Sequence, residues 1–103
     1  CAGSILTTNI TLARHVHINL DCTIGHDVVM QDFVTLAPGV HVSGWVILEE
    51  GAYIGTGANI INGSADAPLV IGAWSVIGSG ACVTRSIPPY VTAVGIPAKP
   101  LVR

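Results

Sequence analysis

The sequence of 103 residues contains little charge and no long hydrophobic run. Charged residues make up 10% of it, and four Lys or Arg against six Asp or Glu give a formal net charge of −2. Such a chain has no basic field to attract nucleic acid, so we expect no nucleic-acid partner. No apolar run approaches the roughly 18 residues of a membrane span, so we expect no membrane partner either.

Cysteine is also scarce. The chain has three, Cys1, Cys22 and Cys82, which is an odd number without close spacing. This pattern is typical of reduced thiols in a cytoplasmic protein and not of a disulfide framework. We therefore expect a cytoplasmic location.

The sequence does contain a repeat of six residues, which begins at Ser4. The first residue of ten successive hexads is apolar in nine cases, and the third residue is apolar in all ten. The third positions are Leu6, Leu12, Ile18, Ile24, Met30, Leu36, Val42, Leu48, Ile54 and Ile60. A period of six is the signature of a hexapeptide β-helix, in which each hexad forms one short flat face and one corner. We predict an all-β fold, a single-stranded parallel β-helix with triangular coils of three hexads.

Charged residues follow the same division. They fall at positions four to six of their hexads and never at positions one or three: Arg14, Asp21, Asp27, Asp32, Glu49, Glu50 and Arg85. Burying an unpaired charge in a narrow apolar interior is costly. Positions one and three are therefore predicted to point inward, and the polar residues to lie at the corners.

The repeat divides the chain into segments. Hexads occupy residues 4–63 and 69–86, and residues 64–68 (Ser-Ala-Asp-Ala-Pro) fit no hexad, so they are predicted to form a corner loop. The proline-rich residues 87–103 are expected to cap the stack, because proline cannot donate to a parallel ladder. The start has no comparable cap and no Met, so we expect residues 1–103 to be the β-helix domain of a longer protein whose upstream domain is missing.

A coil of three hexads converts sequence separation into proximity. Residues that are three hexads apart lie on adjacent rungs, about 4.8 Å from each other, so His26 is predicted to lie beside Gly44. Histidine ionises near neutral pH and can take a proton from an amine or a hydroxyl, and a neighbouring acid such as Asp27 can fix its tautomer. The pair His26–Asp27 is therefore the strongest candidate for acid–base chemistry. Two solvated corner residues without a function would give the same sequence pattern.

Several motifs extend beyond the repeat: His26-Asp27, Asp32–Gly39 (DFVTLAPG), Ser43-Gly44, Ile54–Ala58, Val76–Ala81 and Gly95–Lys99. With these motifs the chain resembles, from about residue 10 to 101, a family of bacterial sugar acetyltransferases. The family includes the sialic-acid O-acetyltransferases and the N-acetyltransferases that act on nucleotide-linked 4-amino sugars. The resemblance implies a left-handed β-helix that assembles as a homotrimer.

The resemblance also implies roles for individual residues. His26 would be the general base and Asp27 its orienting partner, while the N–H of Gly44 would face the thioester of the co-substrate acetyl-CoA. The residues implied to line the pantetheine arm and nucleotide of acetyl-CoA are Thr56, Gly78, Ser79, Ile96, Pro97 and Lys99. The acceptor would be an amine or hydroxyl of a sugar or nucleotide-sugar, acetylated by direct transfer at a site without metal. Two departures stand out: Thr35 replaces a histidine found in many relatives, and the α/β domain that precedes the repeat in full-length relatives is absent.

Two other functions fit the same fold. A γ-class carbonic anhydrase-like enzyme would need three histidines that converge on zinc across a subunit interface, and no two histidines here share a column. A non-catalytic β-helix would serve only assembly or binding. We expect His15, His17 and His41 at the surface, and exposed Trp45 and Trp74 at a subunit interface.

Overall fold

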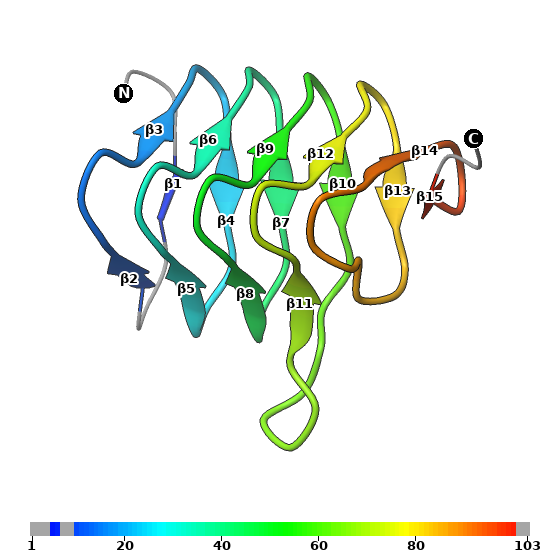
Figure 1. Cartoon of the computed structure of the whole chain (residues 1–103). Coiled ribbons are helices and arrows are strands. Elements are labelled where there is room, and N and C mark those ends of the chain that lie inside the picture. Colours follow the sequence, from blue (N-terminus) through cyan, green and yellow to red (C-terminus); the bar gives the residue numbers. More distant parts are fainter. Residues whose placement is uncertain (1–4, 7–9, 101–103) are drawn as a thin grey trace.

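The chain winds as a left-handed parallel β-helix with three flat sides (Figure 1). A computed structural model describes residues 5–6 and 10–100, so Cys1, Ser4 and the last three residues of the predicted cap lie outside the description. Within the described residues the secondary structure is all β-strand. None of these residues forms a helix with the length and hydrophobicity of a membrane span.

Each side of the prism is one β-sheet. Sheet A contains β1 (Ile5–Leu6), β4 (Thr23–Ile24), β7 (His41–Val42), β10 (Asn59–Ile60) and β13 (Cys82–Val83). Sheet B contains β2 (Ile10–Leu12), β5 (Val28–Met30), β8 (Val46–Leu48) and β11 (Leu69–Ile71). Sheet C contains β3 (His17–Ile18), β6 (Thr35–Leu36), β9 (Tyr53–Ile54), β12 (Val76–Ile77), β14 (Thr92–Val94) and β15 (Lys99–Pro100).

Strand register confirms the coil of three hexads. Val28 on β5 pairs with Val46 on β8, which lies three hexads later in the sequence. Val46 pairs in turn with Leu69, which lies further along the chain because the segment 64–68 is inserted into that coil. This segment forms a loop that projects from the corner between β10 and β11 (Figure 1).

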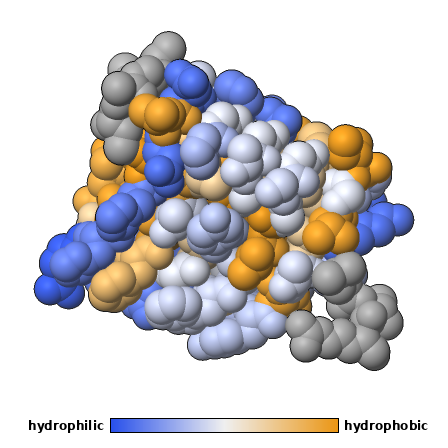
Figure 2. Space-filling view, turned by 90° about the horizontal axis from the view of Figure 1, so that it is seen from above, coloured by the Kyte–Doolittle hydropathy of each residue, from blue (hydrophilic) through white to orange (hydrophobic). Residues whose placement is uncertain are grey.

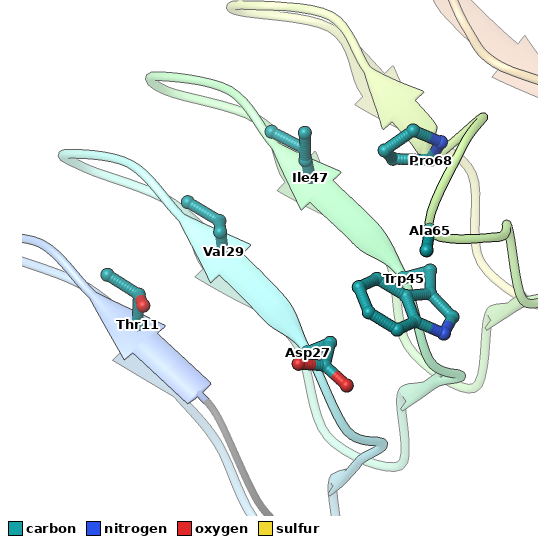
Figure 3. A pocket seen from close by; sticks show the side chains of 7 residues that line it. All are labelled: Thr11, Asp27, Val29, Trp45, Ile47, Ala65 and Pro68. Carbon is teal, nitrogen blue, oxygen red and sulfur yellow. The ribbon is translucent and has the colours of Figure 1, made fainter.

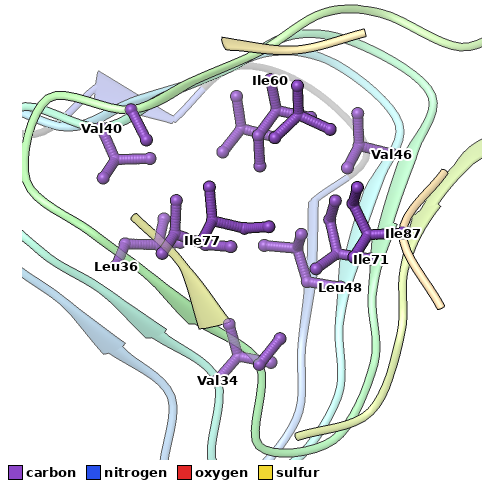
Figure 4. Close-up of a cluster of buried hydrophobic side chains, with 14 of the residues drawn as sticks. Val34, Leu36, Val40, Val46, Leu48, Ile60, Ile71, Ile77 and Ile87 are labelled. Atoms are coloured by element: carbon purple, nitrogen blue, oxygen red, sulfur yellow. The ribbon is translucent and has the colours of Figure 1, made fainter. Parts of the chain in front are cut away.

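First- and third-position side chains fill the interior of the prism (Figure 4). Every such residue from Cys22 to Val83 is buried, which confirms the predicted orientation. The only polar one among them is Ser75, whose hydroxyl donates a hydrogen bond to the Gly72 carbonyl at 2.6 Å. Leu12 is in register with buried Met30 but is itself 45% exposed, because it lies near the end of the described stack.

The sixth residue of most hexads turns the corner with a left-handed backbone. Positive φ angles occur at His15, Asp21, Asp27, Phe33, Gly39, Trp45, Gly51, Gly57, Trp74 and Gly80. Residues other than glycine pay about 1–2 kcal/mol for this conformation. The repeating corner therefore imposes strain that burial of the two inward residues of each hexad offsets.

The C-terminal segment does more than cap the stack, which differs from our expectation. Ile87 forms a parallel bridge with Ile71, and β14 pairs in parallel with β12. Ile87 and Ala93 are buried, so they extend the apolar interior even though prolines surround them in sequence. Only β15 turns back, antiparallel to β14, and covers the end of sheet C.

Exposed apolar groups occur on several parts of the surface, and two of them, Tyr53 and Val76, are neighbours on sheet C. Seen from above, hydrophobic patches are separated by polar and intermediate ones (Figure 2). Trp74 is 48% exposed, as expected for a sixth-position indole. Its packing at a subunit interface stays a prediction.

A pair of leucines tests the inward pattern. Leu36 is fully buried, so Leu36→Ala is expected to lower the free energy of unfolding by about 2–5 kcal/mol. Leu20 is 53% exposed, so Leu20→Ala should change it by less than about 0.5 kcal/mol. Urea denaturation measures both. Equal losses would contradict the assignment of interior positions.

Candidate active site

The corner between sheets A and B holds the strongest candidate residues. The chain leaves β4, turns through Gly25–Asp27 and enters β5. One coil later it leaves β7, turns through Ser43–Trp45 and enters β8. The N–H of Trp45 donates to the carbonyl of His26 at 3.1 Å, so the second turn stacks directly on the first.

The side chains of His26 and Asp27 form a hydrogen-bonded pair. Nδ1 of His26 donates to Oδ2 of Asp27 at 2.9 Å, and the two side chains are 54% and 24% exposed. With its proton held at Nδ1, the ring offers the lone pair of Nε2 to a ligand. The pair thus has the arrangement that a general base and its orienting acid need.

Gly44 lies against the ring of His26. A Cβ at position 44 would be 2.7 Å from both Cε1 and Nε2 of His26, which is closer than any real side chain approaches. The predicted proximity of His26 and Gly44 is confirmed. Only glycine lets the imidazole lie flush against this turn.

Amides at the fifth position of a hexad take no part in the backbone hydrogen bonds between coils of the described residues. At the corner between sheets B and C, three of these amides donate to side-chain oxygens: Arg14 to Asp32, Glu50 to Gln31 and Ala73 to Glu49. No acceptor for the N–H of Gly44 is found within residues 5–6 and 10–100. This amide therefore has no partner in the described structure, as is also true of the amides of His26 and Asn62 at the same corner.

Trp45 contacts the ring of His26 from another side. The two rings meet edge to face, with centroids 5.9 Å apart and an interplanar angle of 88°. The indole is half-buried, whereas the sequence predicted an exposed group for an interface. The rule of three hexads per coil could have found this contact, because Trp45 lies one rung from Asp27, the neighbour of His26.

The predicted cofactor residues Thr56, Gly78 and Ser79 lie at a different corner, between sheets C and A. They stack closely there, because a Cβ at Gly55 would be 2.7 Å from the N of Ser79. Sheet A separates this corner from His26. One chain therefore does not bring these three residues to the candidate base.

Ile96 and Pro97 belong to the tail that crosses the C-terminal end of sheet A, and Lys99 follows in β15 of sheet C. Cys82 anchors this tail, since its N–H donates to the carbonyl of Gly95 at 3.0 Å and its carbonyl accepts from the N–H of Ala98 at 2.7 Å.

Pro97 and Lys99 line a hollow of about 530 Å³ together with Arg85, whereas Ile96 lies outside its lining and is 79% exposed. Arg85 lies at the same corner as His26, three rungs or about 14 Å away.

The remaining histidines lie apart from His26. His15 stacks on Phe33 with ring centroids 5.1 Å apart, and Nδ1 of His41 shares a hydrogen bond with the hydroxyl of Thr23. These two and His17 are exposed, as predicted. In the part of the chain that the structure describes, no three His, Cys, Asp or Glu side chains gather as metal ligands would.

Known proteins of similar sequence are acyltransferases, among them acetyltransferases and acyl-[acyl-carrier-protein]–UDP-N-acetylglucosamine O-acyltransferases. No protein-family model matches the chain. It is 43% identical to GDP-perosamine N-acetyltransferase from Escherichia coli O157:H7, over 98 residues that cover 95% of this chain and 44% of that protein. The chain thus spans less than half the length of this relative.

Solved structures that match this chain include an acetyltransferase as well. WeeI from Acinetobacter baumannii AYE matches 98% of this chain and 48% of its own with 46% identity and a TM-score of 0.96. A histidine-to-asparagine mutant of perosamine N-acetyltransferase from Caulobacter crescentus, in complex with CoA and GDP-perosamine, matches with 28% identity and a TM-score of 0.75. That match covers 98% of this chain and 54% of the other.

Proposed function

We propose that the chain forms the β-helix part of a hexapeptide-repeat sugar acetyltransferase, a class of enzyme that it resembles over nearly its whole length. The reaction would move an acetyl group from acetyl-CoA to the amino group of a nucleotide-linked sugar. The observation that carries this proposal is the contact of the His26–Asp27 pair with the turn at Gly44, whose N–H is unused in the described structure.

The three groups fit the steps of direct acyl transfer. Nε2 of His26 takes a proton from the acceptor nitrogen as that nitrogen forms its bond to the thioester carbonyl carbon. The N–H of Gly44 donates to the oxygen that becomes negative in the tetrahedral intermediate. The imidazolium is stabilised by the Asp27 carboxylate and returns its proton to the sulfur as the carbon–sulfur bond breaks.

Acetyl-CoA would lie between neighbouring copies of the chain in a homotrimer. This arrangement is supported by the separation of Thr56, Gly78 and Ser79 from His26 across sheet A, because a second copy can present that corner to the base. The hollow beside Pro97 and Lys99 has room for part of the nucleotide, and Lys99 can neutralise a phosphate. Ile96 would contact the same end of the co-substrate.

The acceptor is proposed to be a nucleotide-linked amino sugar, as in the perosamine N-acetyltransferases. Thr35 lies two rungs below Val76 on the outer face of sheet C, where it cannot act as a base.

We place the reaction in the cytoplasm, where Cys22 and Cys82, both free, would stay reduced.

A matched pair of aspartates tests this function. The protein is expected to release CoA thiol from acetyl-CoA when GDP-perosamine is added, as measured with a thiol reagent. Asp27→Asn should slow this release by at least about tenfold, because the amide carries no charge to stabilise the imidazolium and can donate to Nδ1 and so hold the wrong tautomer. Asp21→Asn should leave the rate unchanged, since Asp21 occupies the same left-handed corner position without contacting His26.

Both substitutions keep a residue that tolerates a left-handed backbone, so folding should be equal in the two variants. Equal rates in the two variants would remove Asp27 from the mechanism. If wild-type protein bound neither acetyl-CoA nor GDP-perosamine, the chain would instead serve as a non-catalytic β-helix.

A further inference from the structure

A pocket of about 320 Å³ lies on the outer face of sheet B, directly beside the candidate active site (Figure 3). Its floor is formed by Val29 and Ile47, with Thr11 at the far end. Asp27 and Trp45 line the edge toward His26, and Ala65 and Pro68 of the projecting loop line the other side. This volume is at the lower end of the range for small-molecule sites.

The pocket depends on the segment that interrupts the repeat. The loop of residues 64–68 begins and ends on the turn that touches His26, because Gly63 N–H donates to the carbonyl of Gly44 and Leu69 N–H to that of Trp45, both at 3.0 Å. Its ends are also tied together by two backbone hydrogen bonds between Ser64 and Ala67. Insertions of this kind on a rigid scaffold commonly carry binding residues.

Two residues belong to both the pocket and the candidate active site. Asp27 holds His26 through Oδ2, and its Oδ1 accepts no hydrogen bond from any residue within the described ranges. The indole of Trp45 contacts the ring of His26 edge to face and also forms a wall of the pocket. A molecule in the pocket therefore lies one side chain away from the proposed base.

We propose that this pocket holds the sugar ring of the acceptor and that Trp45 and the loop of residues 64–68 determine which sugars are accepted. The inference rests on the function proposed above and specifies its acceptor site. A pyranose has a face of C–H groups that suits the floor of Val29 and Ile47 and the indole of Trp45. A neutral sugar amine or a hydroxyl can donate a hydrogen bond to the open oxygen of Asp27, which places an amino group at the end of the pocket nearest His26.

The charge of the pocket favours an amino sugar over an acidic one. Asp27 is the only ionisable residue among its lining residues in the described structure, and its carboxylate accepts hydrogen bonds from a neutral amine. A sugar that carries a carboxylate would meet a like charge. The acceptor class is therefore a neutral or amine-bearing hexose linked to a nucleotide.

Intrinsic fluorescence reports on the pocket, because the chain has two tryptophans at different corners. In a Trp74→Phe variant all tryptophan emission comes from Trp45. GDP-perosamine is expected to change this emission saturably in the absence of acetyl-CoA, whereas GDP is not. In a Trp45→Phe variant, GDP-perosamine should leave the emission of Trp74 unchanged.

An equal change of Trp45 emission with GDP would place the nucleotide in the pocket and overturn the proposal. No change at concentrations of GDP-perosamine that saturate turnover would also overturn it.

Two alanines of the same loop provide a second test through steady-state kinetics. Ala65 lines the pocket and Ala67 does not, and both are exposed, so neither substitution should unfold the protein. Ala65→Leu is expected to raise the KM for GDP-perosamine by at least about tenfold and to leave the KM for acetyl-CoA unchanged. Ala67→Leu should change neither.

The two ways of failing are distinct. Transfer by the wild type with equal KM values in both variants would refute the pocket and leave the proposed function intact. An absence of transfer by the wild type would refute the proposed function, and a saturable response of Trp45 to GDP-perosamine but not GDP would then still support the pocket as a sugar site.

Discussion

Replacement of His26 by asparagine is expected to lower kcat for acetyl transfer by about 10²–10⁴-fold, the range that a general base contributes. Asparagine can keep a hydrogen bond to Asp27 but cannot take a proton from the acceptor nitrogen. The side chain of His26 is 54% exposed, so the substitution should leave the β-helix intact. Thiol release under saturating acetyl-CoA and GDP-perosamine measures the loss, and circular dichroism checks the fold.

His15→Asn is the matched control. His15 is also exposed and lies at a corner, but it stacks on Phe33 between sheets B and C, away from Gly44. Its left-handed backbone accommodates asparagine, so neither kcat nor folding should change. Full activity of His26→Asn, or equal losses in the two variants, would contradict the assignment of His26 as the base.

Replacement of Gly44 by alanine is expected to reduce kcat by about a hundredfold while the protein stays folded. The new Cβ would lie 2.7 Å from Cε1 and Nε2 of His26, so the ring must move. Because this ring is largely exposed, it can swing toward solvent at little cost in stability. The base would then be displaced from the amide that is proposed to hold the thioester oxygen.

Gly39→Ala should show the opposite behaviour. The φ angle of Gly39 is +74°, so alanine is strained there and should lower the free energy of unfolding by about 1 kcal/mol. Its Cβ would meet only ordinary contacts, 3.8 Å from Gly57 Cα, and kcat should stay unchanged. Loss of stability without loss of activity in Gly44→Ala would show that this glycine serves only the fold.

The fold could be predicted because each hexad repeats one physical requirement. Two inward positions are apolar in almost every hexad and charged residues occupy the corners, and this pattern indicates a β-helix with coils of three hexads. The coil length of three hexads predicts that His26 lies against Gly44. The same coil length places Trp45 beside Asp27.

Other features depend on interactions that the period does not encode. The stack extends through Ile87 and Ala93 because both apolar side chains are buried. They lie in a proline-rich segment in which the hexad pattern can no longer be recognised. Whether a fifth-position amide has an acceptor depends on the side chains around it, such as Asp32, Gln31 and Glu49, and the period does not predict their orientation. The pocket on sheet B depends on the path of the loop of residues 64–68. The hexad repeat does not predict that path.

The most direct measurement is a crystal structure of the protein with a non-hydrolysable acetyl-CoA analogue. We predict that its carbonyl oxygen lies about 3 Å from the N of Gly44, with Nε2 of His26 facing the open side of the carbonyl carbon. A carbonyl group bound at another corner, beyond hydrogen-bonding reach of Gly44 and His26, would contradict the account.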